Sequence, residues 1–144
     1  MTTTVTESSW TERDEASGLY VRKVYEFGDC LGRTAKAVKM SGALDTGWDE
    51  LEALVDTTRF RRIDGDGVAI DWPAYREMLV TASAPAGFRK VFDRVSQAGN
   101  RVFMELTEYD RPAGEAERAV GLCTVYQFDA ADRLVGMEIY TRGG

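Results

Sequence analysis

The stretch from Asn100 to Arg142 reads NRVFMELTEYDRPAGEAERAVGLCTVYQFDAADRLVGMEIYTR. It predicts three successive antiparallel strands, Arg101–Asp110, Glu117–Phe128 and Leu134–Arg142, because apolar and polar side chains alternate with a period of two along each of them. Residues typical of turns separate the strands. The alternation leaves the predicted sheet with one largely apolar face, which the rest of the chain or a ligand must cover.

The apolar face of this predicted sheet takes every second residue of each strand. Its members are Val102, Met104, Leu106 and Glu108, then Val120, Leu122, Thr124 and Tyr126, then Val135, Met137, Ile139 and Thr141. Glu108, Thr124 and Thr141 interrupt its apolar character. These polar groups on an otherwise hydrophobic surface are the first candidates for contacts with a ligand.

The composition is that of one globular domain: 144 residues, 44% of them hydrophobic and 29% charged. No apolar run approaches the ~18 residues that a membrane-spanning helix needs, and the first residues lack the basic and apolar regions of a secretory signal. We therefore expect a cytoplasmic protein that does not bind a membrane. A net charge of −6 without a basic cluster argues against nucleic-acid binding.

The sequence contains no histidine, which limits its chemistry. Ser-His-Asp and Cys-His catalysis are excluded, so any proton transfer must use Asp, Glu, Tyr, Lys, Cys or a bound water. Cys30 and Cys123 match no metal-binding spacing, so two free thiols are predicted. Asp64 and Asp66 lie in a turn signal that no longer calcium-loop pattern follows, and neither a metal nor another cofactor is predicted.

Residues 1–31 are predicted to form a partly flexible N-terminal extension. Within it, residues 10–27 fit a helix or a strand, with the helix favoured, and Gly28 and Asp29 end this element. The main domain, residues 32–144, is predicted to contain further elements before the three strands. They are helices at Gly32–Leu44 and Trp48–Val55, strands at Thr57–Ile63 and Val68–Ile70, a helix that Asp71 caps, and a strand at Phe88–Val95.

This order of elements predicts an α+β fold. Four long antiparallel strands and several amphipathic helices bury their apolar faces most economically if a curved antiparallel sheet wraps around the helices as a cone-shaped barrel. Such a cone leaves an internal cavity between the sheet and the helices. A cavity of this kind suits a hydrophobic small molecule.

Three stretches carry a family resemblance: ALDTGWDELEALV at residues 43–55, VYQFDAADRL at 125–134 and VGMEIY at 135–140. They resemble the nuclear-transport-factor-two-like superfamily, the fold of ketosteroid isomerase, limonene epoxide hydrolase and the SnoaL-like polyketide cyclases. The resemblance covers Gly32 to Arg142 and implies the cone fold, but not one function, because this fold hosts many chemistries and many binding roles. It also implies a homodimer through the outer sheet face, which carries Phe103, Tyr109 and Val125.

The catalytic positions of ketosteroid isomerase carry other residue types here. Its base and its protonated acid fall on Arg62 and Thr124, and its oxyanion-hole tyrosine falls near Met40, so that apparatus is lost. Arg62 shares a predicted strand face with Phe60 and therefore points inward on this interpretation. An inward arginine would bind a carboxylate or an enolate, or would pair with Glu108. The alternative is a surface arginine beside the following turn.

In the Asp-Arg-Asp relay of the epoxide hydrolases, the arginine falls on Leu106 and the two aspartates fall on Glu108 and Ile139, so a faithful copy of the relay is excluded. The cyclases use an acidic pocket residue as base, which is a looser requirement that Glu108 meets. Glu108 ends the inward-facing stripe of its strand, where partial desolvation would favour the protonated carboxyl and suit a histidine-free general base. The alternative is a solvated position at the rim, where the strand leaves the core.

The predicted site combines one catalytic residue with a set of ligand contacts. Glu108 is the predicted base, and the predicted substrate-binding residues are Arg62, Thr124, Tyr126, Met40, Phe60, Met104, Leu106, Leu122, Met137, Ile139, Trp72 and Tyr75. An alternative role exists for four of these residues. The hydroxyl of Thr124 would form a hydrogen bond with a backbone group, and the rings of Phe60, Trp72 and Tyr75 would only pack in the core.

We therefore expect an enzyme of the SnoaL-like kind, acting without a cofactor on a polyketide-like or other hydrophobic oxygenated substrate. Cyclisation, isomerisation or dehydration would fit, with Glu108 as base and with Arg62, Thr124 or Tyr126 orienting substrate oxygens. The alternative is a small-molecule-binding or dimeric assembly domain that keeps the fold and has lost the chemistry. Binding without turnover would distinguish this alternative from the enzyme.

Overall fold

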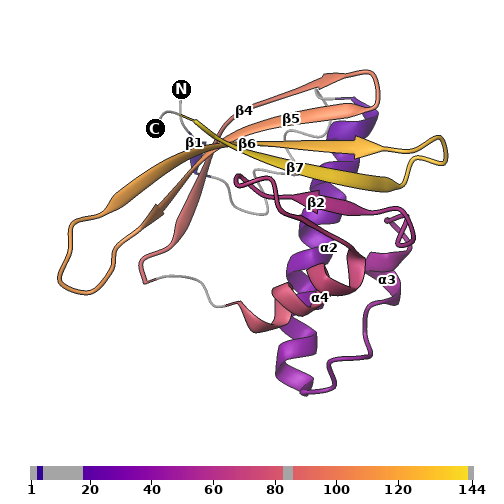
Figure 1. Cartoon of the computed structure of the whole chain (residues 1–144), viewed down its shortest axis with the longest axis horizontal. Helices are drawn as coiled ribbons and strands as arrows, with labels where there is room; N and C mark the ends of the chain where they lie inside the picture. The colour runs from indigo at the N-terminus through magenta and orange to yellow at the C-terminus, as the bar shows by residue number, and fades with distance from the viewer. Residues whose placement is uncertain (1–2, 5–17, 83–85, 143–144) are drawn as a thin grey trace.

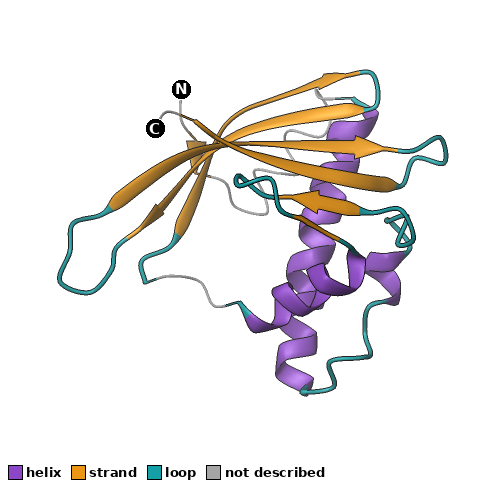
Figure 2. Ribbon diagram, viewed as in Figure 1, coloured by secondary structure: helices purple, strands orange, loops and turns teal. Residues whose placement is uncertain are grey.

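The computed structural model describes residues 3–4, 18–82 and 86–142 (Figure 1). The elements are β1 (Thr3–Thr4), α2 (Leu19–Ser41), α3 (Asp49–Glu52), β2 (Arg61–Ile63), β3 (Ala69–Ile70), α4 (Trp72–Thr81), β4 (Arg89–Ala98), β5 (Arg101–Asp110), β6 (Arg118–Phe128) and β7 (Leu134–Arg142). The strands form one seven-stranded sheet in the order β1-β4-β5-β6-β7-β2-β3. The sheet is curled and open, with β1 and β3 at its edges, and the helices lie on one side of it (Figure 2). The predicted α+β class and the curved sheet around helices are confirmed.

The predicted meander forms β5, β6 and β7, paired antiparallel in sequence order, and β4 extends it at one side. One prediction about its faces is wrong. The register shifts between Gln127 and Phe128, so that Gln127 pairs with Gly136 and Phe128 pairs with Leu134. Val135 is the extra residue of this bulge, and Leu134, not Val135, is buried in the core. A bulge of one residue reverses the alternation on one side of it.

The β2 strand joins the other edge of the meander by a parallel pairing with β7, which the sequence analysis did not predict. Arg62 lies opposite Met137 in this pairing, and β3 returns antiparallel to β2. The β2 strand is shorter than the predicted Thr57–Ile63, because Asp56 accepts hydrogen bonds from the backbone N–H groups of Arg59 and Phe60 and holds that segment in a turn. The parallel pairing is what brings Arg62 to the concave face.

Helix α2 differs most from its prediction. It runs unbroken from Leu19 to Ser41, whereas Gly28 and Asp29 were expected to end one element and Gly32 to begin another. Helical glycines cost roughly 1 kcal/mol each relative to alanine. Burial of the apolar face of α2 against the sheet outweighs that cost, and residues 19–31 thereby contribute to the core. The predicted boundary at residue 31 lies inside this helix.

The remaining helices, α3 and α4, begin close to their predicted positions. Helix α3 is shorter than predicted, and α4 begins after Asp71, whose carboxylate accepts a hydrogen bond from the backbone N–H of Ala74 at 3.1 Å. This is the predicted N-cap. Residues 1–2, 5–17, 83–85 and 143–144 lie outside the described part of the chain, and with them about half of the predicted N-terminal extension. None of the described helices combines the length and the apolar character needed to cross a bilayer.

Candidate functional site

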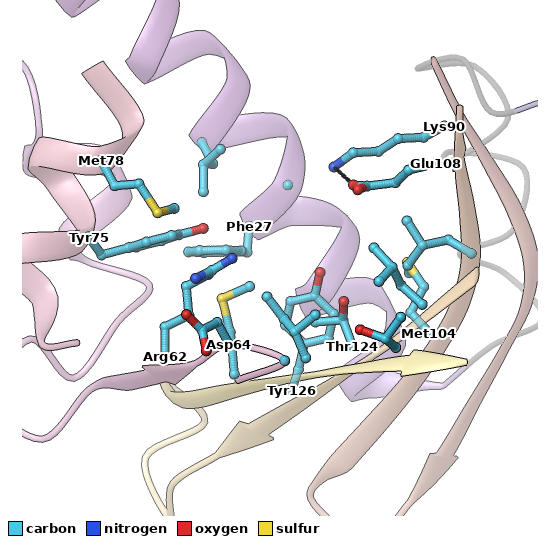
Figure 3. A pocket seen from close by; sticks show the side chains of 18 of the residues that line it. Phe27, Arg62, Asp64, Tyr75, Met78, Lys90, Met104, Glu108, Thr124 and Tyr126 are labelled. Atoms are coloured by element: carbon cyan, nitrogen blue, oxygen red, sulfur yellow. Dashed lines mark ion pairs between the residues drawn. The ribbon is translucent and has the colours of Figure 1, made fainter. Parts of the chain in front are cut away.

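A pocket of about 760 Å³ lies between the concave face of the sheet and helices α2 and α4 (Figure 3). This volume is within the range of small-molecule sites. Most of the predicted site residues line it: Glu108, Arg62, Thr124, Tyr126, Met104, Leu106, Leu122, Met137, Ile139 and Tyr75. They come together because β5, β6 and β7 present alternate residues to the same side, and because β2 and α4 close one end of the pocket.

Three predicted ligand contacts do not reach this pocket. Phe60 and Trp72 are buried in the core, where their rings meet edge to face with centroids 5.2 Å apart. Met40 is 79% exposed near the end of α2. Because α2 begins at Leu19, its pocket-facing residues lie further towards its N-terminus, at Phe27 and Leu31. Met40 therefore lies away from the pocket.

Several lining residues were missed by the sequence analysis. They are Phe27, Gly28 and Leu31 of α2, Asp64, Gly65 and Asp66 of the β2–β3 turn, Met78 and Leu79 of α4, Lys90 and Phe92 of β4, and Thr141 of β7. Met78 and Leu79 follow Tyr75 at helical spacing, and Thr141 belongs to the predicted apolar face of the sheet. Those patterns could have placed them. Lys90 could have been found only from the register of β4 against β5.

Arg62 is the charged residue at one end of the pocket. Its guanidinium carbon lies 5.8 Å from the centre of the Tyr75 ring, and Figure 3 shows the group directed towards Tyr75 and Phe27. Within the described part of the chain, no carboxylate oxygen lies within 4.0 Å of the guanidinium. The predicted inward orientation is therefore found, and the predicted pairing with Glu108 is not.

Tyr75 and Tyr126 place two phenol groups near Arg62. Burial raises the pKa of Tyr75 to about 12, partly opposed by the positive charge of Arg62. Burial also raises the pKa of Tyr126, with a smaller contribution from Tyr75 and again an opposing one from Arg62. Both phenols are therefore neutral hydrogen-bond donors near neutral pH. No hydrogen bond to either hydroxyl, or to that of Thr124, is formed by the residues that the structure describes.

Glu108 lies at the other end of the pocket and has Lys90 beside it. The two residues are direct cross-strand partners in β5 and β4, and their charged groups are 3.9 Å apart. The Glu108 side chain is 32% exposed and that of Lys90 47%. The carboxylate thus reaches the pocket, as predicted, from a partly solvated position, and a lysine rather than Arg62 is its partner.

The β2–β3 turn adds two carboxylates to the rim. Asp64 accepts hydrogen bonds from the backbone N–H groups of Asp66 and Val68 at 2.9 and 3.0 Å, which is the turn role that its sequence context predicted. Asp66 is exposed. No cluster of three Asp, Glu or Cys side chains suited to a metal ion occurs among the described residues. Cys30 and Cys123 are both free thiols.

Comparison with known proteins identifies the fold. No family model matches the sequence, and no curated protein shows significant sequence similarity to it. A predicted SnoaL-like polyketide cyclase from Jannaschia sp. CCS1 superposes with a TM-score of 0.53 at 14% identity, over 79% of this chain and 86% of that one. An LEH-like epoxide hydrolase from M. tuberculosis gives 0.50 at 17% identity, over 74% and 79%. TerC, co-crystallized with polyporic acid, gives 0.50 at 13% identity, over 74% and 88%.

These similarities define the class of the protein by its architecture. The chain has the NTF2-like fold, shared with SnoaL-like cyclases, ketosteroid isomerase-like proteins and LEH-like epoxide hydrolases. At such low identity the comparison identifies the fold alone. The chemistry must be argued from the pocket itself.

Proposed function

We propose that the protein is a cofactor-free enzyme that binds a hydrophobic, oxygenated small molecule in this pocket and catalyses a proton-transfer reaction on it. The observation that carries the proposal is the combination of one reachable carboxylate, Glu108, with donors from Arg62, Tyr126 and Thr124 that have no hydrogen-bond partner among the described residues, all around one cavity. Aliphatic side chains and methionines form the walls between them. A site of this composition holds an apolar body and positions its oxygens.

Glu108 is the proposed base. Its carboxylate takes a proton from a carbon next to a substrate carbonyl, and the resulting negative charge develops on the carbonyl oxygen. The ammonium group of Lys90, 3.9 Å from the carboxylate, is placed to stabilise that oxygen. Return of the proton to a different carbon gives an isomer, and attack of the carbanion on a second carbonyl closes a ring. Polyketide-like substrates contain carbons acidic enough for both outcomes.

The test is solvent exchange on a panel of hydrophobic β-diketones in D₂O, followed by proton NMR with and without the protein. We expect the wild-type protein to speed deuterium incorporation at the carbon between the carbonyls. Glu108→Gln should lower this rate by about 10²–10⁴-fold, because a positioned base contributes that much to proton transfer. Glu115→Gln, an exposed glutamate on the β5–β6 connection, is the matched control and should leave the rate unchanged. Full activity in the Glu108→Gln variant would refute the assignment.

One observation favours a second function. Glu108 already has an ion-pair partner in Lys90, 3.9 Å away, and the donor groups of Arg62, Tyr126 and Thr124 are as useful for binding as for catalysis. A protein that binds its ligand without changing it would retain the pocket and the donors. Tight binding of a panel compound together with an exchange rate equal to that of the buffer would identify this second function.

We also propose that two chains associate through the outer, convex face of the sheet. Val125 is buried within this face, Phe103 is half-buried, and Tyr140 is 50% exposed. Arginines lie over two of the aromatic rings, Arg89 over Tyr109 at 3.8 Å and Arg101 over Phe103 at 5.6 Å. Stacked arginines and aromatic rings are enriched at protein interfaces.

A further inference from the structure

The donor groups around Arg62 have no acceptors among the residues that the structure describes, and this imbalance indicates which groups a ligand must carry. The guanidinium of Arg62 can only donate hydrogen bonds, and the hydroxyls of Tyr75 and Tyr126 are neutral near physiological pH. Neither hydroxyl has a partner within the described residues, and the guanidinium has no carboxylate within 4.0 Å of it. These groups are free to donate hydrogen bonds to acceptor atoms of a molecule in the pocket. An oxygen-rich ligand would satisfy all three.

The charged side chains that line the pocket indicate what charge the ligand carries. Lys90 and Glu108 form a pair with each other, at 3.9 Å. Asp64 keeps its Oδ1 atom on the backbone N–H groups of its own turn, and Asp66 is exposed on that turn. Arg62 is therefore the cation of the pocket whose charge no ion pair offsets among the described residues. A ligand carboxylate at this position would form the ion pair with Arg62 that none of the described residues forms.

The register of the strands sets how far this cation lies from the proposed base. Arg62 pairs with Met137, Met137 with Tyr126, and Tyr126 with Val102, so these residues form one row across the sheet. Glu108 lies six residues along β5 from Val102, which is about 20 Å at ~3.3 Å per residue. The side chains of Arg62 and Glu108 extend from opposite ends of the pocket towards the space between them (Figure 3). A ligand that meets both groups must be elongated.

We propose that the ligand of this pocket is an elongated, hydrophobic carboxylic acid whose carboxylate binds Arg62, Tyr75 and Tyr126. This inference rests on the proposed role of the pocket as a small-molecule site, and it deepens that role by naming the substrate class. The carboxylate accepts hydrogen bonds from the guanidinium and the two hydroxyls. The apolar body lies along Met104, Leu106 and Leu122, and the far end of the molecule reaches Glu108.

The test compares an acid with its uncharged analogue. Binding of biphenyl-4-carboxylate and of biphenyl-4-carboxamide is measured by isothermal titration calorimetry at pH 7.5 in low salt. We expect the wild-type protein to bind the acid at least tenfold more tightly than the amide. Arg62→Gln should abolish this preference, and Arg62→Lys should reduce it without reversing it, because lysine keeps the charge but not the planar fork of donors. Tyr75→Phe should weaken binding of the acid more than binding of the amide.

Arg61→Gln is the matched control, since it removes the same charge from the neighbouring residue. Arg61 lines a groove on the opposite face of the sheet and donates a hydrogen bond to the carbonyl of Phe60. The Arg61→Gln variant should still prefer the acid over the amide. Thermal unfolding checks that each variant is folded. Equal affinity for acid and amide in the wild-type protein, binding of neither compound, or a preference that survives in Arg62→Gln would overturn the proposal.

The two proposals fail in different ways. Binding of the acid that depends on Arg62, combined with no effect of Glu108→Gln on deuterium exchange, would refute the catalytic proposal and support the ligand class. Exchange that depends on Glu108 but is indifferent to Arg62 and to ligand charge would refute the ligand class and leave the catalytic proposal standing.

Discussion

At the scale of single residues, the pocket contains polar groups that the fold does not need. Tyr75 and Tyr126 pack their rings into the core or against it, and their hydroxyls face a space where nothing described in the chain accepts a hydrogen bond from them. Phenylalanine would fill the same space in the core without placing a hydroxyl in the pocket. Polar groups that packing does not require are candidates for a role in function.

Tyr75 supports a prediction about alkaline pH. Burial raises its pKa to about 12 in the folded protein, against an ordinary value of about 10 in the unfolded chain. Because the folded-state pKa is the higher one, the stabilising contribution is complete below pH 10 and is lost as the pH rises towards 12. At pH 11 the loss is about 1 kcal/mol.

Urea unfolding of wild type and Tyr75→Phe at pH 8 and pH 11 measures this contribution. The free energy of unfolding should fall less in the variant between the two pH values, by about 1 kcal/mol. Titration of tyrosinate absorbance should show the loss of one late-titrating phenol. An identical pH dependence in both proteins would mean that this hydroxyl is well solvated.

At the scale of elements, helix α2 decides how much of the chain belongs to the core. Its predicted break at Gly28 and Asp29 relied on the low helix propensity of glycine, and Gly32 was expected to begin a second helix. Burial of apolar side chains outweighs the low helix propensity of glycine here, because Val24, Phe27 and Cys30 lie on one face of a continuous helix and pack against the sheet. The strand β7 shows the same effect on a smaller scale, where the bulge at Val135 reverses a face that the alternation alone assigns.

Two glycines of α2 lead to opposite predictions. An added Cβ at Gly32 meets nothing within 4 Å, so Gly32→Ala should raise the free energy of unfolding by about 1 kcal/mol. Gly42 ends the helix with a φ of 72°, where its backbone N–H donates to the carbonyl of Val38. Gly42→Ala should lower stability by about 1 kcal/mol, because this left-handed conformation disfavours a side chain.

Guanidinium-induced unfolding followed by circular dichroism compares both variants with the wild-type protein. If Gly32→Ala destabilised the protein, the continuous helix through this position would be in doubt. Gly42→Ala serves as the control, since it makes the same chemical change in the same helix at a position with a different backbone conformation.

At the scale of the whole molecule, we propose different roles for the concave and the convex face of the curled sheet. The concave face and the helices enclose the pocket, while the convex face carries the aromatic rings proposed for association. Phe103→Glu should therefore convert a dimer to a monomer without altering the pocket, because it places a charge at the centre of the proposed interface. The same change at Met40, on the exposed end of α2, should leave the dimer intact.

Sedimentation velocity at about 20 μM, a concentration at which a dimer of ordinary affinity is populated, separates these outcomes. A wild-type protein that sediments as a monomer would contradict the proposed interface. So would a dimer that Phe103→Glu leaves unchanged.

The sequence by itself determined the meander of β5, β6 and β7, the N-cap at Asp71 and most of the pocket wall. Alternation with a period of two and helix capping are local properties, and each depends on residues close together in the chain. Glu108, Thr124 and Tyr126 could be assigned to one face for that reason. The absence of histidine restricted the chemistry without any reference to structure.

The tertiary structure alone decided which charges meet. The parallel pairing of β2 with β7 brings Arg62 into one row with Tyr126, with Met137 between them, although 64 positions separate Arg62 and Tyr126 in the numbering. The register of β4 against β5 places Lys90 rather than Arg62 next to Glu108. Pairings between distant strands depend on the packing of the whole sheet, and no local pattern encodes them. The position of Arg62, which forms no ion pair with any of the described residues and on which the proposed ligand class depends, results from those pairings.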